Sequence, residues 1–248
     1  MLIHEKPITW YVEKLARGEP FSFAGFSDAE WLCVLSLRLG AQTALGQTIS
    51  REHGWRLAEV LHERQADPRF LFAVPKCLWE RDIFGDGCID RWLANHDIII
   101  ESYERDMVLD DLAAQAGLHP LIQQLQKMRV VMIGPRPLRG CGFLGYRRFI
   151  EISSPNLHLE PDGIERAVEK TLICAKPSVY LVSAGVSAAI LIHRLHDQIP
   201  DSWFIDCGSI WDGFVKVGAQ RQWRAELYAD TEKWYRWIHD NLYGKEQP

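Results

Sequence analysis

The stretch Val179–Asp206, VYLVSAGVSAAILIHRLHDQIPDSWFID, decides the fold of this 248-residue chain. Its first four residues are apolar and predict a buried strand, and the small residues that follow predict a tight turn. An amphipathic segment over 186–197 predicts a helix, and residues 203–206 predict a second strand. A strand, a helix and a strand in this order form the unit from which parallel sheets are built.

The same alternation extends through most of the chain. Further strands are predicted over 21–26, 70–74, 97–101, 129–133 and 149–153, and helices over 7–17, 28–39, 51–65, 104–127, 161–175 and 221–243. This order predicts an α/β fold: a Rossmann-like, doubly wound and mostly parallel sheet with helices on both faces and a long C-terminal helix. Because no repeat or low-complexity linker divides the sequence, we expect a single domain over 1–248 with a core over about 20–215.

Composition excludes several classes of protein. The chain has 28 Lys and Arg against 33 Asp and Glu, a net charge of −5, which argues against a nucleic-acid-binding protein. No run approaches the roughly 18 apolar residues of a membrane span, and the first residues do not form a signal peptide, although peripheral membrane association stays open. The six Cys are scattered without metal-finger spacing. We therefore expect reduced, buried thiols in a cytoplasmic protein.

Two carboxylates follow the predicted strand over 21–26, in the sequence Ser27-Asp28-Ala29-Glu30. At the carboxyl end of a parallel strand, Asp28 and Glu30 could hold a divalent cation, which would neutralise a diphosphate. Ser27 followed three residues later by Glu30 is also a helix capping box. The two interpretations are compatible, and both stay open. Ser27 is also a candidate for contact with the donor phosphates.

Two further strand ends could bind phosphate. In the turn Ser183–Ser187, Gly185 and Ser187 lie where a strand enters a helix, and free backbone N–H groups there form an anion site. Gly134 and Arg136 follow another strand, and Arg136 could bind a phosphate in bidentate geometry. An ordinary tight turn and a solvated loop arginine are the structural alternatives.

The last strand end carries Asp206 and Asp212. Either carboxylate could accept a hydrogen bond from a sugar hydroxyl or act as a general base, and an Asx turn is the alternative. On the preceding predicted helix, His193 and His196 are three residues apart, which favours a surface pair over a metal site.

The chain has ten Trp. Those on predicted helices are expected to pack: Trp55, Trp92, Trp223, Trp234 and Trp237. Trp31 and Trp211 adjoin the acidic motifs, so we predict that these two rings stack on a base or a sugar.

Four motifs in this order resemble the GT-D-fold glycosyltransferases, a group once catalogued as a domain of unknown function. The stretch Phe23–Trp31 is similar to the family's R-F-G-D-G-E segment, and Val130–Pro135 to its strand-G-P element. Ser183–Gly185 and Phe204–Asp212 resemble its S-x-G and D-x-G-x-x-x-D elements. The resemblance spans roughly residues 20–215. The chain departs from the family pattern at Gly25, Ser27 and Ala29, where the family usually has Arg, Gly and Gly.

The resemblance implies a Rossmann-like enzyme that transfers a sugar from a nucleotide-sugar donor, typically UDP-linked, to a glycan acceptor. It implies that Asp28 and Glu30 help to bind Mn²⁺, or Mg²⁺ in its place, and the donor diphosphate. Two other classes stay open: a metal-independent nucleotide-dependent transferase that uses only the 185–187 turn, and a non-catalytic module that binds nucleotide or glycan.

Overall fold

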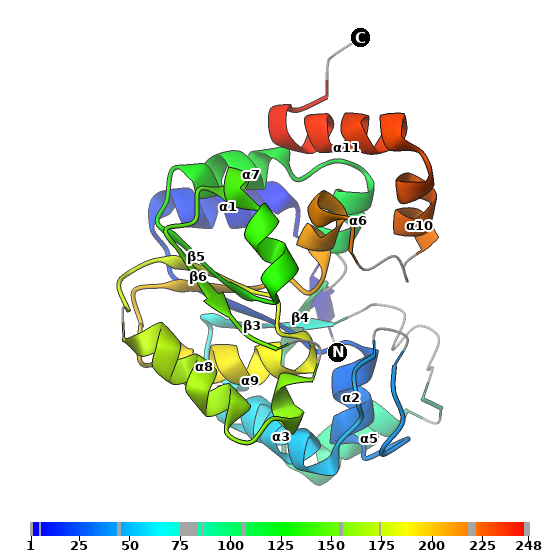
Figure 1. Cartoon of the computed structure of the whole chain (residues 1–248). Helices are drawn as coiled ribbons and strands as arrows, with labels where there is room; N and C mark the ends of the chain where they lie inside the picture. The colour runs from blue at the N-terminus through cyan, green and yellow to red at the C-terminus, as the bar shows by residue number, and fades with distance from the viewer. Residues whose placement is uncertain are drawn as a thin grey trace.

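The computed structural model describes residues 2–4, 6–43, 46–74, 84–85, 87–105, 108–153, 156–173, 175–217 and 222–245. In this part of the chain, one eight-stranded sheet has the order β1-β4-β3-β2-β8-β7-β5-β6, and all neighbouring strands are parallel (Figure 1). The strands are β1 (Leu2–His4), β2 (Ser22–Gly25), β3 (Phe70–Val74), β4 (Ser102–Arg105), β5 (Val130–Gly134), β6 (Arg148–Glu151), β7 (Val179–Val182) and β8 (Trp203–Asp206). The predicted α/β class with a parallel sheet is confirmed.

Helices cover both faces of the sheet (Figure 1). One face packs against α2 (Asp28–Val34), α3 (Arg51–Arg64), α5 (Cys88–Asn95), α8 (Gly163–Leu172) and α9 (Ala188–His196). The other packs against α1 (Ile8–Arg17), α6 (Val108–Ala114), α7 (His119–Gln126), α10 (Gln222–Ala229) and α11 (Thr231–Tyr243). None of the described helices is long and apolar enough to cross a membrane.

Alternation along the central strands explains the two cores. In β7, Tyr180 and Val182 face the core on the α9 side, and Val179 and Leu181 face the core on the α7 side. Successive side chains of a strand point to opposite faces, so a strand buried on both sides reads as a continuous apolar run. This is why the strands over 179–182 and 203–206 were predictable to the residue.

Four predicted elements differ from the structure. The strand predicted over 97–101 lies at Ser102–Arg105 instead, and it pairs with β1 and β3. The helix predicted over 104–127 is divided into α6 and α7, with Ala116 in a left-handed conformation between them (φ 53°). The long C-terminal helix is also two helices, because the Asp230 side chain accepts hydrogen bonds from the Glu232 and Lys233 amides and caps α11.

The helix predicted over 28–39 ends at Val34. Ser36 and Arg38 have φ angles of 53° and 52°, a left-handed conformation that does not continue a helix. Short 3₁₀ turns follow other strands and loops: η1 (Arg136–Gly140), η2 (Gly142–Leu144), η3 (Leu157–Leu159), η4 (Gly185–Ser187) and η5 (Ile210–Val215).

Among the described cysteines, Cys33, Cys141 and Cys207 are free thiols. Cys33, Cys141 and Cys207 are buried and Cys88 is half-buried. Cys77 and Cys174 lie outside the described residues.

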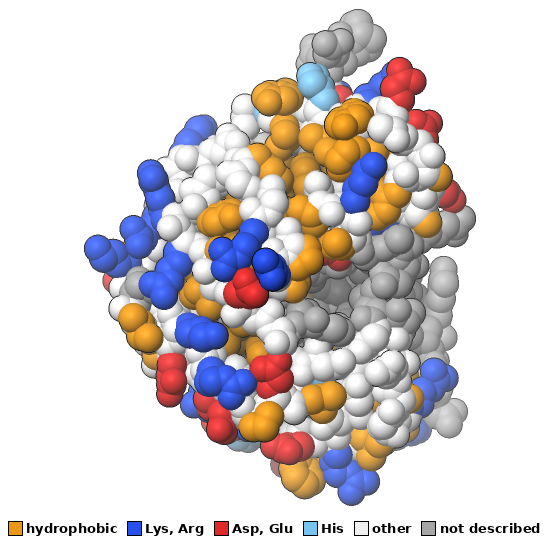
Figure 2. Space-filling view, viewed as in Figure 1, with side chains coloured by type: hydrophobic (Ala, Val, Ile, Leu, Met, Phe, Trp, Pro, Cys, Tyr) orange, Lys and Arg blue, Asp and Glu red, His pale blue; other side chains and the backbone are white. Residues whose placement is uncertain are grey.

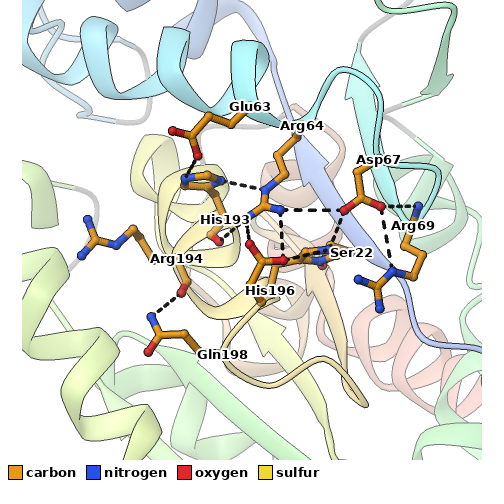
Figure 3. A network of polar contacts seen from close by, with 10 residues as sticks. Ser22, Glu63, Arg64, Asp67, Arg69, His193, Arg194, His196 and Gln198 are labelled. Carbon is orange, nitrogen blue, oxygen red and sulfur yellow. Dashed lines mark hydrogen bonds and ion pairs between the residues drawn. The ribbon is translucent and has the colours of Figure 1, made fainter.

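The prediction of a surface pair at His193 and His196 is wrong. Both side chains are buried in a polar network that joins the ends of α3 and α9 to the start of β2 (Figure 3). Arg64 Nε donates to His193 Nδ1 at 2.9 Å. His196 Nδ1 lies 2.7 Å from Ser22 Oγ, and its Nε2 lies 2.9 Å from Asp67 Oδ2. Sequence periodicity placed these residues on a helix, but it did not show that polar groups of α3 and β2 cover them.

Ser22, His196 and Asp67 are linked by hydrogen bonds in the same sequence as the Ser-His-Asp triad of a hydrolase. They cannot form a catalytic triad here. Ser22 is fully buried and lies at the amino end of its strand, so no substrate carbonyl can reach its hydroxyl. The network is therefore structural.

Burial lowers the pKa of His193 and His196, and the Arg64 guanidinium lowers both further. The unfolded chain, in which a histidine pKa is about 6.5, therefore takes up more protons than the folded one as the pH falls. We expect the free energy of unfolding of the wild type, relative to His196→Asn, to fall by about 1 kcal/mol between pH 7.5 and 5.5 in urea titrations. A difference between the two proteins that does not change with pH would contradict this expectation.

Candidate functional site

The carboxyl ends of β2 and β8 lie side by side, because Phe23 pairs with Ile205 in parallel register. Asp206 is the last residue of β8, and its carboxylate joins the two ends. One oxygen accepts from the Gly25 amide at 3.1 Å and the other from the Gly208 amide at 2.9 Å. The half-buried Asp206 is thus held in position by backbone groups from two elements.

Glu30 lies in the first turn of α2, directly after β2. Its Oε2 accepts hydrogen bonds from the Ser27 amide at 2.9 Å and from Ser27 Oγ at 2.5 Å. The predicted capping box is therefore present. Both hydrogen bonds come from Ser27, and its hydroxyl, which the glycine of the resembled pattern would lack, supplies one of them.

Glu30 and Asp206 form a concentration of negative charge. Burial raises the pKa of Glu30 to about 7, and the neighbouring charges of Asp206 and Asp28 contribute to the rise. Burial also raises the pKa of Asp206 to about 6, although the amides of Gly208 and Gly25 oppose the change. Neither carboxylate forms an ion pair with a Lys or Arg of the described residues. A cation at this site would relieve the repulsion.

This donor set fits a divalent cation that arrives with a diphosphate. Mg²⁺ and Mn²⁺ prefer carboxylate oxygens, and Mg²⁺ is usually held by one or two carboxylates together with substrate phosphates. Glu30 and Asp206 meet that requirement, and Asp28 is exposed at the start of α2. The described residues contain no group of three or more His, Cys, Asp or Glu that could hold a metal alone.

The β7 turn lies beside this acidic pair, because β7 and β8 are neighbours in the sheet. Gly185 has a φ of 56°, and η4 leads directly into α9. The Ser183 and Ser187 hydroxyls are buried and have no hydrogen-bond partner among the described residues. The backbone N–H groups at the start of the helix suit an anion, and the two buried hydroxyls lie beneath them.

His53, which sequence reasoning missed, holds this turn, and a second histidine, His158, packs against it. His53 Nε2 donates to the Val186 carbonyl at 2.8 Å, and its ring lies 4.3 Å from that of His158. His158 Nε2 donates to the Thr48 carbonyl at 3.0 Å. Burial lowers the pKa of both histidines, so both are neutral at pH 7. No motif links positions 53 and 158, so only the tertiary structure brings them together.

The end of β5 carries two candidate residues, Gly134 and Arg136, and the structure gives them different roles. A Cβ added at Gly134 would lie 3.0 Å from Leu138 Cδ1 and 3.4 Å from Ser183 Cβ, so this glycine allows the β5 and β7 ends to pack closely. Arg136 is exposed at the start of η1 and forms no ion pair within the described part of the chain. Of the two, Arg136 has a side chain available for a phosphate.

Asp212 has a partner that the sequence did not indicate. Its carboxylate lies 3.4 Å from the Arg224 guanidinium, which also contacts Asp110 at 3.1 Å and the Ser209 carbonyl at 2.6 Å. Arg224 is fully buried. Asp212 therefore attaches η5 to α10 and α6, and Asp206 is the better candidate for contact with a sugar or for a base.

The prediction that Trp31 and Trp211 stack on a ligand is wrong. Both side chains are fully buried, Trp31 against Phe26 and Trp92 and Trp211 against Phe143. Adjacent residues of a helical turn point in different directions, so neighbours of an acidic motif can enter the core.

Of the five Trp that were expected to pack, four do so. Trp55 was expected to pack, yet 67% of its surface is exposed. Trp92, Trp223 and Trp234 are half-buried, and Trp237 is buried with its Nε1 donating to the Ala113 carbonyl at 2.6 Å.

In the view of Figure 2, the surface is hollowed between α2 and α10, on the side where the strands end.

The whole architecture is similar to that of known structures. One is a domain of unknown function 1792 described as having a distinct glycosyltransferase fold, with 17% identity and a TM-score of 0.61 over 92% of this chain and 82% of that chain. Another is a glycosyltransferase of the same type from Streptococcus sanguinis, with 16% identity and a TM-score of 0.61 over 92% of this chain and 85% of that chain. Neither a protein-family model nor a curated protein sequence matches the chain. The resemblance to the GT-D group is confirmed at the level of the fold.

Proposed function

We propose that this chain is a glycosyltransferase that moves a sugar from a nucleotide-sugar donor, UDP-linked, to a glycan acceptor with the help of Mn²⁺ or Mg²⁺. The observation that carries the proposal is the pair formed by Glu30 and Asp206, which lies where the ends of β2 and β8 meet. Open parallel sheets bind their ligands at such strand ends. The glycosyltransferase fold of the similar structures supports the same activity.

The cation would be held by Glu30 and Asp206, with Asp28 near them, and when bound it neutralises the diphosphate that leaves the sugar. The other roles belong to the chain itself. The 185–187 turn, fixed by His53, offers backbone N–H groups to phosphate oxygens, while the fully buried Ser187 hydroxyl lies beneath the turn. Arg136 approaches the phosphates from the β5 end.

Asp206 has two roles in this proposal, to bind the cation and to accept a hydrogen bond from a sugar hydroxyl, and its geometry allows both. Both of its oxygens accept backbone N–H bonds, which fixes the carboxylate before any ligand arrives. A carboxylate accepts about four hydrogen bonds or metal contacts, so lone pairs remain for a cation or for a sugar hydroxyl. A fixed carboxylate loses little freedom when it binds, and this favours tight binding.

Thermal unfolding with a panel of nucleotides tests the proposal. We expect UDP and UDP-sugars with Mn²⁺ at pH 8, where both carboxyls are ionised, to raise the melting temperature. At a ligand concentration of about 100 times the Kd the stabilisation is about 2.7 kcal/mol. GDP-sugars with Mn²⁺, and UDP without metal, serve as matched controls and should have smaller effects.

The same panel separates the other two classes. Equal stabilisation with and without Mn²⁺ would indicate a metal-independent transferase. Stabilisation by UDP–Mn²⁺ without hydrolysis or transfer of any UDP-sugar would indicate a binding module. If no UDP ligand shifts the melting temperature, the proposal is wrong.

A further inference from the structure

The charge of the chain is unevenly distributed. Six of its 28 Lys and Arg, and none of its 33 Asp and Glu, fall between positions 112 and 150. These six cations, which we call the basic strip, are Lys127, Arg129, Arg136, Arg139, Arg147 and Arg148. A chain with a net charge of −5 thus carries a local region of opposite sign.

One end of the basic strip lies at the amino ends of β5 and β6. The Arg147 amide donates to the Val130 carbonyl at 2.8 Å, and the Val179 amide donates to the Arg129 carbonyl at the same distance. Lys127, Arg129 and Arg147 are exposed and form no ion pair with the residues that the structure describes. Their charge is therefore available to a partner.

The other end lies at the carboxyl end of β5, on the side of the candidate site. Arg136 follows this strand directly, and Arg139 pairs with Glu151 at 3.0 Å and covers the Phe149 ring. The five residues of β5 separate the two ends by about 17 Å, at about 3.3 Å per residue.

A cavity of about 240 Å³ lies at the carboxyl end of β6, between this strand, η3 and α8. Arg166 and Lys170 line it together with Glu151 and Glu160. Glu151 pairs with Arg139 and Glu160 with Arg166, both at 3.0 Å, so these four charges cancel in pairs. Figure 2 shows the Lys and Arg side chains gathered over the left part of this face, toward its hollowed centre.

We propose that the basic strip binds the acceptor, and that the acceptor is an anionic glycan with repeated carboxylate or phosphate groups, extended along β6 toward the strand ends. This inference rests on the proposed function and names the substrate class that it leaves open. Cations at both ends of the strand match a chain whose charges repeat along its length. Such a chain would present its terminus to the site between β2 and β8.

The geometry favours an anionic glycan over an anionic membrane and over a single-stranded nucleic acid. A flat anionic membrane would contact the cations at the amino ends of the strands. It would leave Arg136 and Arg139, at the carboxyl ends, unused. A single-stranded nucleic acid needs open aromatic faces for its bases. Of the described rings beside the basic strip, Phe149 lies under Arg139, and Tyr146 packs against Phe149 with its hydroxyl donating to the Arg139 carbonyl at 2.9 Å.

Binding of polygalacturonate, an anionic glycan, tests the proposal with neutral dextran as the matched polymer. The test variant is Arg129→Glu/Arg147→Glu, and the control is Arg91→Glu/Arg194→Glu, which changes the net charge equally at exposed positions elsewhere. We expect the wild type and the control to bind polygalacturonate within about twofold of each other. The test variant should bind at least about tenfold more weakly, and binding should weaken with added salt.

Equal losses in the test and control variants, or equal binding of dextran, would overturn the proposal. So would tighter binding of anionic vesicles or single-stranded DNA than of polygalacturonate. Glu30→Gln, a change at the donor site, must leave polygalacturonate binding intact. A failure of the proposed function is read separately, because it appears as the absence of UDP binding in the wild type.

Discussion

Glu30→Gln is expected to abolish the stabilisation by UDP and Mn²⁺ while the fold stays intact. Glutamine at this position still forms a capping box with Ser27, so the helix start keeps its hydrogen bonds. It cannot supply a negative oxygen to a cation. We expect the affinity for UDP–Mn²⁺ to fall about 100-fold, equal to about 2.8 kcal/mol. At pH 8 the free protein should melt no earlier than the wild type, because glutamine removes a buried charge that Asp206 and Asp28 repel.

Ser27→Ala is the matched control, because it changes the cap and keeps the carboxylate. Losing an N-cap hydroxyl costs about 1 kcal/mol of stability. This variant should therefore melt earlier than Glu30→Gln when free, yet retain most of the Mn²⁺-dependent shift. Together the two variants separate the cap from the cation site, which the sequence motif alone leaves combined. If Glu30→Gln keeps the full Mn²⁺-dependent shift, then Glu30 is only a capping residue.

Arg224→Met is expected to cause the largest loss of stability, about 3–5 kcal/mol in urea denaturation. The Arg224 guanidinium is fully buried and contacts Asp110 of α6, Asp212 of η5 and the Ser209 carbonyl. Methionine fills a similar volume but removes the charge from a site where two carboxylates meet. Removing one partner of a buried ion pair is costly, because the remaining charges stay in a medium of low polarity.

Arg236→Met is the matched control, since Arg236 is exposed on α11. We expect it to change stability by less than about 0.5 kcal/mol. A similar unfolding midpoint for both variants would show that the Arg224 ion pairs contribute little. Because η5 follows β8 and Asp206 closely in the chain, Arg224→Met should also weaken UDP binding in the protein that remains folded.

Much of the sheet was predictable because its strands are buried on both faces. β7 and β8 are short apolar runs, and turn residues bound them on both sides. β4 was displaced in the prediction because Ile98, Ile99 and Ile100 form the more apolar run. The structure uses Tyr103 and Glu104 instead, and the buried Glu104 is held by Lys6 and Tyr11. A charged residue becomes compatible with a central position only when a distant partner neutralises it.

The candidate site was only partly predictable for a similar reason. The capping box of Ser27 and Glu30 is local and was visible in four residues. The approach of Asp206 to Gly25 and Glu30 depends on the pairing of β2 with β8, which joins residues about 180 positions apart.

The sequence by itself determined the order of strands and helices, the parallel sheet and the strand ends at which polar residues gather. These features follow from local periodicity and turn chemistry, which act within a few residues. Only the tertiary structure decided which of those residues act together. It buried Trp31 and Trp211, paired Asp212 with Arg224 and placed His53 under the 185–187 turn. Side-chain direction and burial depend on contacts between elements far apart in the chain, so local pattern cannot specify them.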